Sequence, residues 1–198
     1  MIKLTSLINE SKILVPRRSG EEREKRWIQE IYRKIQDYIK DGCRGDLDLQ
    51  KTPIKILPDN LKIVGGNLKL SQSKIEDLNN LEYVAGRIDL RYTPIKKLPD
   101  NLKKVVGDLW LGGSKIEDLN NLEEVDGFLD LCNTPIKKLP DRLKKICGSL
   151  NLLRSKIEDL NNLKYVGIYL DLQDTPLSKN TTREEIWSKV NVKEGIYL

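Results

Sequence analysis

The chain has 198 residues, with 35 lysines and arginines against 30 aspartates and glutamates, and no histidine. The absence of histidine excludes Ser-His-Asp and Cys-His catalysis, imidazole metal ligands and a histidine pH switch. A hydrophobic fraction of 38% is low for a compact globule, so the composition favours one elongated domain. The net charge of +5 makes nucleic acid a partner to consider.

The N-terminal segment, residues 1–44, begins without a continuous apolar run. Polar residues interrupt residues 1–11 every few positions, which predicts neither a signal peptide nor a membrane helix. The cysteines Cys43, Cys132 and Cys147 are widely spaced and form no CxxC pair, so we expect neither disulfides nor a zinc site. These features predict a soluble protein of a reducing cytoplasm.

An amphipathic capping helix is predicted in the second half of this segment. Residues 19–22 (SGEE) have the spacing of a capping box, and Gly42 supplies a stop signal. The apolar residues between them recur at helical spacing: Trp27, Ile28, Ile31, Tyr32, Ile35, Tyr38 and Ile39. We expect this face to pack on the first repeat at Leu47 and Leu49, and the alternative is a helix that binds a partner.

From residue 45 to residue 178 the chain consists of repeats. The string TPI begins at Thr52, Thr93 and Thr134, and TPL begins at Thr175, so every spacing is 41 residues. Each 41-residue unit divides into similar halves of 21 and 20 residues, the second of which contains SKIEDLNNL. The repeat is therefore one turn of about twenty residues, present about seven times, which is typical of a solenoid.

Each turn is predicted to contain one short strand and an irregular return path. In the pattern V-x-G-x-L-x-L, alternate residues such as Val84, Ile88 and Leu90 are apolar, which is the period of a strand with one buried face. Proline and turn-forming residues follow, so the back of the turn is expected to be irregular or 3₁₀. The predicted fold is a parallel β-solenoid of about seven turns, with helical caps at both ends.

These turns resemble leucine-rich repeats. Leu109, Leu111 and Ile116 match the LxLxxNxL core of that family, with Ser114 in the place of its asparagine. In the family this asparagine bonds the backbone of adjacent turns, so the resemblance implies that hydroxyls do the same more weakly. The hydroxyl residues concerned are Thr52, Ser73, Thr93, Ser114, Thr134, Ser155 and Thr175.

Residues 179–198 are predicted to cap the C-terminal end of the stack. Thr182 and Glu185 have capping-box spacing, and apolar residues including Ile186 follow them. We expect this short helix to cover the last strand, at residues 170–172, because a terminal turn would otherwise expose its core and strand edge.

The order of these parts resembles repeat proteins of tailed bacteriophages. The phrases ILVPRR at residues 13–18, YIKDG at 38–42 and GDLDL at 45–49, with the TPI turns, carry the resemblance. It implies a viral accessory protein that acts in a bacterial host cytoplasm, and it supplies no active-site residues.

Two columns of strand residues are predicted to point away from the core. One column is Asp46, Asn67, Arg87, Asp108, Phe128, Ser149 and Tyr169, and the other is Asp48, Lys69, Asp89, Trp110, Asp130, Asn151 and Asp171. Exposed aromatic residues mixed with arginine and aspartate have the composition of a protein-binding hot spot. The candidate partner-binding residues are Arg87, Arg91, Tyr92, Trp110, Asp126, Phe128, Asp130, Leu153 and Tyr169. The alternative is that the aromatic rings pack on one another or are covered by a terminal segment.

Charges divide between the repeats and the ends of the chain. Lysine-rich and acid-rich turns alternate, which predicts ion pairs between adjacent turns that help to fix their register. Residues 45–178 hold 20 basic and 20 acidic residues, so the basic excess lies in the caps. The residues chiefly responsible are Arg17, Arg18, Arg23, Lys25 and Arg26.

The sequence favours a non-enzymatic protein-protein interaction module. With the phage resemblance, it implies an accessory protein that binds and inhibits a bacterial host protein such as a defence component. Two alternatives stay open: a nucleic-acid-associated protein that uses the basic N-terminal cap, and a structural virion component. No unique carboxylate pair, activated nucleophile or phosphate loop stands out, so we expect no catalytic residues, no cofactor, no metal and no membrane partner.

Overall fold

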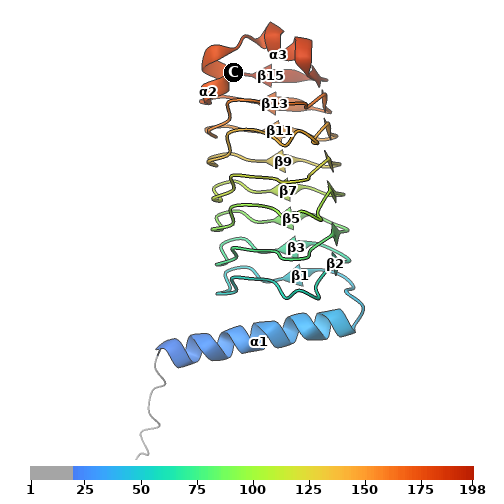
Figure 1. The fold of residues 1–198 in the computed structure, drawn as a ribbon, viewed down its shortest axis with the longest axis vertical. Helices are drawn as coiled ribbons and strands as arrows, with labels where there is room; N and C mark the ends of the chain where they lie inside the picture. Colours follow the sequence, from blue (N-terminus) through green and yellow to red (C-terminus); the bar gives the residue numbers. More distant parts are fainter. Residues whose placement is uncertain (1–19) are drawn as a thin grey trace, which may run out of the picture.

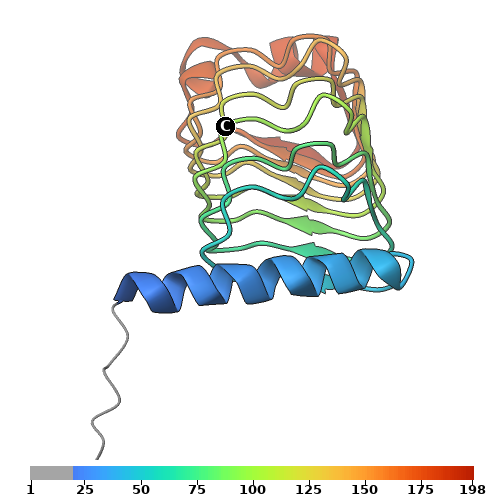
Figure 2. The same ribbon diagram turned by 60° about the horizontal axis from the view of Figure 1, so that its bottom comes forward.

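The computed structural model describes residues 20–198, which form a parallel β-solenoid with a long helix at its N-terminal end (Figures 1 and 2). This confirms the predicted fold class. The predicted capping residue Ser19 and the basic residues Arg17 and Arg18 lie outside the described residues.

The predicted strand of each turn belongs to one eight-stranded parallel sheet. In it, each strand pairs with the equivalent strand of the next turn, so that leucine or isoleucine lies beside leucine or isoleucine along the stack. The strands, in sheet order, are β1 (Leu47–Asp48), β3 (Leu68–Lys69), β5 (Ile88–Asp89), β7 (Leu109–Trp110), β9 (Leu129–Asp130), β11 (Leu150–Asn151), β13 (Tyr169–Asp171) and β15 (Gly195–Tyr197).

A second set of short strands lies just before the glycine of each turn, so the single strand predicted through Val84, Ile88 and Leu90 is divided at that glycine. They form a five-stranded sheet, in the order β14-β12-β10-β8-β6, and a two-stranded sheet of β2 and β4. Their bounds are β2 (Ile63–Val64), β4 (Tyr83–Val84), β6 (Lys104–Val105), β8 (Glu124–Val125), β10 (Lys145–Ile146), β12 (Tyr165–Val166) and β14 (Asn191–Val192). The backs of the turns carry single bridges such as Lys97 with Asp118, and they are otherwise irregular.

The core is a continuous column of leucine, isoleucine and valine that runs the length of the stack. In the central turns these side chains are completely buried, as Leu109 and Val125 are. Glycine occupies the corner between the two strands because neighbouring turns approach closely there. A Cβ atom on Gly107 would lie 2.7 Å from the carbonyl carbon of Gly86. No side chain fits at that distance, so the recurring glycine is a requirement of the stacking.

The hydroxyl ladder expected from the leucine-rich-repeat resemblance does not join adjacent turns. Thr93 Oγ1 donates to the carbonyl oxygen of Leu90 in its own turn, at 2.7 Å, and Ser114 Oγ has no hydrogen-bond partner within residues 20–198. The bonds between turns come instead from the asparagine that follows Asp-Leu in every second turn. Asn120 Nδ2, for example, donates to the carbonyl oxygen of Leu98 at 2.5 Å.

The helix α1 (Gly20–Lys40) packs on the first turn, as its apolar spacing predicts. Ile31 and Ile35 are buried in the solenoid core, while Trp27 at the same face remains 48% exposed. The helix ends in a Schellman motif, with Gly42 at φ 77° and Cys43 N–H bonded to the carbonyl oxygen of residue 38 at 3.0 Å. The helix therefore covers the N-terminal edge of the stack (Figure 2).

The C-terminal segment both caps the stack and continues it. The helices α2 (Pro176–Asn180) and α3 (Arg183–Lys189) form the back of the last turn, and the predicted capping box of Thr182 and Glu185 is present. The strands β14 and β15 then extend both sheets beyond residue 178. The expected last strand, at residues 170–172, is thus the seventh of eight.

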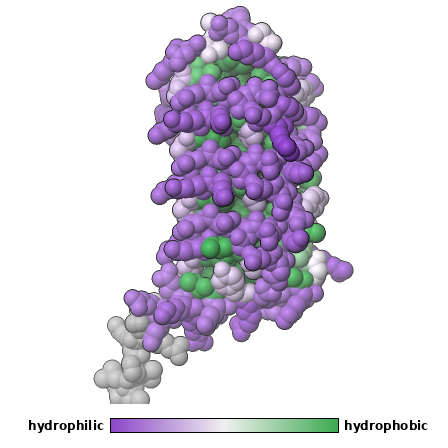
Figure 3. Space-filling model, viewed as in Figure 1, coloured by the Kyte–Doolittle hydropathy of each residue, from purple (hydrophilic) through white to green (hydrophobic). Residues whose placement is uncertain are grey.

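Ion pairs connect adjacent turns along the surface, as the alternation of charges predicts. Lys62 and Glu82 lie 3.0 Å apart, and Lys104 and Glu124 lie 3.1 Å apart. One face of the molecule accordingly shows hydrophilic side chains in rows across the stack (Figure 3). Exposed pairs of this kind contribute about 0 to 1 kcal/mol each, so their combined role is to favour one register.

Candidate interaction surface

The centre of the predicted patch is Trp110 on β7. The guanidinium carbons of Arg87 and Arg91 lie 4.6 and 4.4 Å from the centroid of its ring, both from the turn of the neighbouring strand β5. Cation–π contacts of this kind hold an indole and a guanidinium against each other with about 0.5 to 2 kcal/mol. The Nε1 atom of Trp110 is buried and has no hydrogen-bond partner among residues 20–198.

The two arginines differ in how they are held. Arg91 donates from Nε and Nη2 to the two carboxylate oxygens of Asp89, at 2.9 and 2.8 Å, and Asp89 is only 3% exposed. This bidentate contact raises the pKa of Arg91. Arg87 makes no ion pair within residues 20–198. Arg91 is therefore fixed by its own turn, whereas the charge of Arg87 is available to a ligand.

The recurring aspartates of the second column have a structural role that the sequence did not reveal. In each case a side-chain oxygen accepts a hydrogen bond from the backbone N–H two residues later. The distance is 3.1 Å from Asp130 to Cys132 and 3.0 Å from Asp171 to Gln173. These are Asx turns, which shape the exit from each strand. The recurring aspartates of this column therefore have a structural role, which Asn151 shares; Lys69 and Trp110 depart from the pattern, and Lys69 pairs with Asp46.

In the first column, asparagine and aspartate side chains form a ladder of hydrogen bonds from one turn to the next. Asn67 Oδ1 accepts the backbone N–H of Arg87, and Asp108 Oδ1 accepts that of Phe128, both at 2.9 Å. Arg87 and Phe128 interrupt the ladder, because their side chains do not accept its hydrogen bonds. Their backbone N–H groups still donate to it, so only their side chains are free of this structural role.

The Gly112-Gly113 pair makes room for the edge of the patch. Tyr92 is 67% exposed, and a Cβ atom on Gly113 would lie 2.6 Å from the Tyr92 ring. Gly113 also has φ 68°, a left-handed conformation that favours glycine. The tyrosine ring therefore lies directly over Gly113, which places it beside the turn of Trp110.

The remaining candidates are not all in one place. Phe128 and Leu153 are half-buried on the same face, and Asp130 is the register partner of Trp110. Tyr169 makes an edge-to-face contact with Tyr197, with ring centroids 5.9 Å apart. Tyr197 is not among the residues predicted from the sequence, because β15 lies after two helices and outside the recognisable repeat.

Asp126 does not belong to this patch, contrary to the sequence-based expectation. It follows β8 at the corner of the turn and pairs with Lys104 at 2.9 Å. The expectation that a terminal segment could cover the sheet is also not met within residues 20–198. There α1 crosses one end of the stack and the C-terminal segment forms the last turn (Figure 1).

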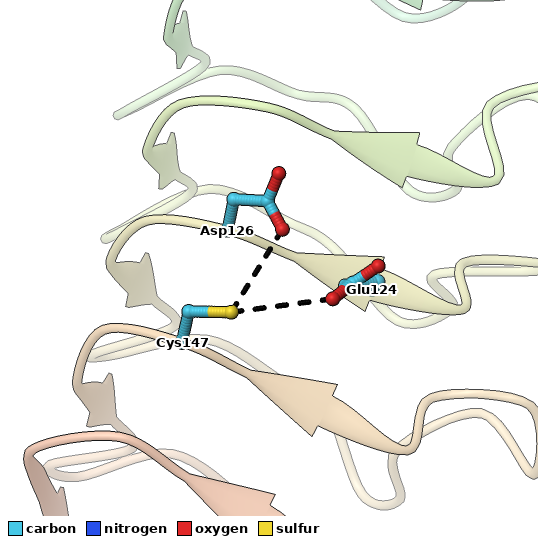
Figure 4. Close-up of side chains that lie close together, drawn as sticks. All are labelled: Glu124, Asp126 and Cys147. Carbon is cyan, nitrogen blue, oxygen red and sulfur yellow. Dashed lines mark hydrogen bonds between the residues drawn. The ribbon is translucent and has the colours of Figure 1, made fainter.

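Asp126 instead joins Glu124 and Cys147 in a small cluster of metal-binding residue types (Figure 4). Cys147 Sγ lies 3.8 Å from Asp126 Oδ1 and 4.0 Å from Glu124 Oε1. Thiolate and carboxylate are ligands that zinc accepts. However, the ammonium of Lys145 lies 2.8 Å from Glu124, and that of Lys104 lies 3.1 Å from it.

These two lysines already supply the positive charge at the cluster. They lower the pKa of Glu124, Lys145 more than Lys104, and Asp126 with Glu124 raises the pKa of Lys104. A divalent cation would have to displace both ammonium groups, so the geometry does not argue for a metal site.

The described part of the basic N-terminal cap is close to neutral. The helix α1 carries five acidic and six basic residues, so the acids offset Arg23, Lys25 and Arg26. Arg26 pairs with Glu30 at 3.3 Å, within the helix. A continuous basic surface, which nucleic-acid binding requires, is not formed by this helix.

None of the helices within residues 20–198 has the length and apolar character needed to cross a membrane. Comparison of the chain with protein-family models, with curated proteins and with solved structures finds no match in any of the three. Its function must therefore be argued from the surface itself.

Proposed function

We propose that this chain is a non-enzymatic protein-binding module that uses the outward face of its eight-stranded sheet. The observation that carries the proposal is the stacking of Arg87 and Arg91 on Trp110, with the indole Nε1 buried and without an acceptor among residues 20–198. Tryptophan and arginine are the residues most enriched at binding hot spots.

The contrast between scaffold and patch supports this proposal. Inward positions keep leucine, isoleucine or valine in turn after turn. Aspartate and asparagine of the outward columns accept backbone hydrogen bonds, from the next turn in the first column and in Asx turns in the second. Trp110, Phe128 and Arg87 stand in place of these residues and make no such side-chain bond within residues 20–198. Sheet faces of solenoids are extended surfaces on which such local differences create a binding site.

The partner class to try first is a bacterial host protein. This choice depends on the resemblance to repeat proteins of tailed bacteriophages, which suggests an accessory protein that inhibits a host factor. Residues 20–40 favour protein over nucleic acid, because their acidic and basic side chains nearly balance.

Affinity capture from bacterial lysate, followed by measurement of the affinity of each purified candidate, tests the proposal. The variant Trp110→Ala with Phe128→Ala should lose the specific partner, with affinity reduced at least about tenfold. The matched control is Tyr83→Ala with Tyr165→Ala, which removes two aromatic rings from the second set of strands. Equal affinity of all three proteins would rule out the sheet face as the binding surface.

Two other outcomes would favour the alternatives. Binding of DNA or RNA that weakens steeply with salt would support a nucleic-acid-associated protein. Recovery of the chain from purified phage particles would support a structural component of the virion.

A further inference from the structure

The outward face of the eight-stranded sheet has two electrostatically different halves. From β1 to β5, two of the acidic column residues are ion-paired on the face itself: Asp46 with Lys69 and Asp89 with Arg91, each at 2.8 Å. From β7 to β15, the two columns contain aspartates but neither lysine nor arginine. The three aspartates of this second half are Asp108, Asp130 and Asp171.

None of these three aspartates forms an ion pair within residues 20–198, although the charge of Asp130 contributes to the raised pKa of Arg91. Asp108 accepts the N–H of Phe128, at 2.9 Å, and Asp171 accepts that of Gln173, at 3.0 Å. Asp130 accepts the N–H of Cys132 and the Nδ2 of Asn151, both at 3.1 Å. Amide hydrogen bonds orient a carboxylate but leave its net charge in place. The charged residues of the two columns in this half are therefore all acidic, while Arg87 and Arg91 of the first half lie over Trp110 at its β7 edge.

Aromatic side chains stand in the same columns as these aspartates. Trp110 and Phe128 lie on the turns of β7 and β9, and Tyr169 and Tyr197 on β13 and β15. Carboxylates bind guanidinium and ammonium groups by charge-assisted hydrogen bonds, and aromatic faces bind the same cations. The half-face thus combines the two groups that together recognise arginine and lysine.

The spacing of the aspartates fits an extended chain. Asp130 and Asp171 are two strands apart in the sheet, which corresponds to about 10 Å along the stack. A peptide in the extended polyproline II conformation advances about 3.1 Å per residue with three residues per turn, so every third side chain lies on one side, about 9 Å apart, and can meet Asp130 and Asp171.

We infer that the sheet face from β7 to β15 binds an extended segment of the partner that carries arginine or lysine side chains. This inference rests on the proposed function, and it specifies the chemistry of the partner. The complementary charge of this face would select such segments and speed their encounter with the protein.

A charge-only substitution is available within the protein's own scaffold. Asn67 and Asn151 already occupy the two column positions and accept the same backbone hydrogen bonds that the aspartates accept, at 2.9 and 3.0 Å. Replacement of Asp108, Asp130 and Asp171 by asparagine should therefore remove three charges and keep the turns intact.

The experiment uses fluorescence anisotropy of labelled proline-rich peptides of about 12 residues with arginine at every third position, or glutamate at the same positions. The full chain should bind the arginine peptide and not the glutamate peptide. The triple variant D108N/D130N/D171N should bind the arginine peptide at least about tenfold more weakly. The control D59N/D100N/D141N makes the same charge change at exposed positions on the backs of the turns and should bind within about twofold.

Absence of binding to the arginine peptide, equal binding of the two peptides, or equal losses in the two triple variants would overturn the inference. The capture experiment separates this failure from that of the proposed function. If capture of the partner needs Trp110 but is unchanged in D108N/D130N/D171N, the sheet face binds a partner of different chemistry and only the present inference is wrong. If neither variant alters capture, both proposals are wrong.

Discussion

Asp89 and Arg91, two residues apart in one turn, form a closed unit on the sheet face. The carboxylate accepts two hydrogen bonds from the guanidinium and a third, at 3.2 Å, from the backbone N–H of Arg91. The guanidinium then stacks on the ring of Trp110 in the next turn. A buried carboxylate thus sets the position of the arginine that holds the central aromatic residue of the patch.

Substitution of Asp89 should separate its two roles. Asp89→Asn keeps an acceptor for the backbone of Arg91 but loses the bidentate contact, and it should lower the free energy of unfolding by about 1 kcal/mol. Asp89→Ala loses both the acceptor and the bidentate contact and should lower the free energy of unfolding by about 2 to 3 kcal/mol. The loss is no larger because Arg91 is 40% exposed, so water replaces part of the contact. Urea denaturation of both variants measures the difference, and equal losses would contradict the two-role interpretation.

The glycine at the corner of each turn should tolerate no side chain in the middle of the stack. Gly107→Ala would place Cβ 2.7 Å from the backbone of Gly86, which cannot move without separating two turns. We expect a loss of about 2 to 4 kcal/mol in the free energy of unfolding. Gly195→Ala is the control, because a Cβ there meets no atom within 4 Å. Thermal denaturation should leave the control nearly unchanged, and a similar loss in both variants would refute the steric explanation.

The solenoid itself could be predicted from the sequence because the same pattern of apolar and turn-forming residues recurs in every turn. The 41-residue spacing places Leu68, Ile88 and Leu109 in register, and the structure pairs them as neighbours. The sequence placed Val84 in the same strand as Ile88 and Leu90, because all three fit one alternating pattern, and it did not show that the strand is divided at the glycine into pieces of two residues. Two residues are too few for an alternating pattern to be visible.

The proposed binding surface could be predicted only in part. The column alignment correctly placed Trp110 on the turn next to Arg87 and Arg91, but it could not show that both guanidinium groups stack on the ring. It also included Asp126, because the strand frame was extended past the corner where the chain turns into β9. Tyr197 was missed since the last turn has helices in its back and lacks the repeat phrase.

The asparagine ladder between turns offers a test of what replaces the hydroxyl ladder. Asn120 has φ 48° and donates to the carbonyl oxygen of Leu98 in the preceding turn. Asn120→Ala loses this bond and strains the left-handed backbone, which should cost about 2 kcal/mol of unfolding free energy. Asn120→Gly removes only the bond and should cost about 1 kcal/mol. Chemical denaturation in which the glycine variant is the less stable of the two would contradict this division.

The lysines around Cys147 should decide whether its cluster binds a metal ion. In the wild type, the ammonium groups of Lys104 and Lys145 lie within about 3 Å of the carboxylates, so zinc should not raise the melting temperature. The variant Lys104→Met with Lys145→Met leaves Glu124 and Asp126 without these partners. Because a ligand that binds only the folded state stabilises it, this variant should melt at a higher temperature with zinc than without. Further replacement of Cys147 by serine should weaken the effect, and an unchanged melting temperature in the double variant would contradict the interpretation.

Cys132 should be an unreactive thiol in the folded protein. Burial, with a smaller effect from the neighbouring carboxylate of Asp130, raises its pKa from 9.0 to about 11. A raised pKa means that folding favours the protonated thiol. The stability that this contributes is present below the pKa of the unfolded chain and is lost as the pH rises through about 11.

At a pH of about 8 the folded protein should hold roughly 100-fold less Cys132 thiolate than the unfolded chain. Alkylation by iodoacetamide, followed by mass spectrometry of the Cys132 peptide, should therefore be slower by at least about that factor in buffer than in urea. Asp130→Asn removes the smaller of the two causes and should recover only part of the rate. Equal rates in buffer and urea would contradict the raised pKa of the Cys132 thiol.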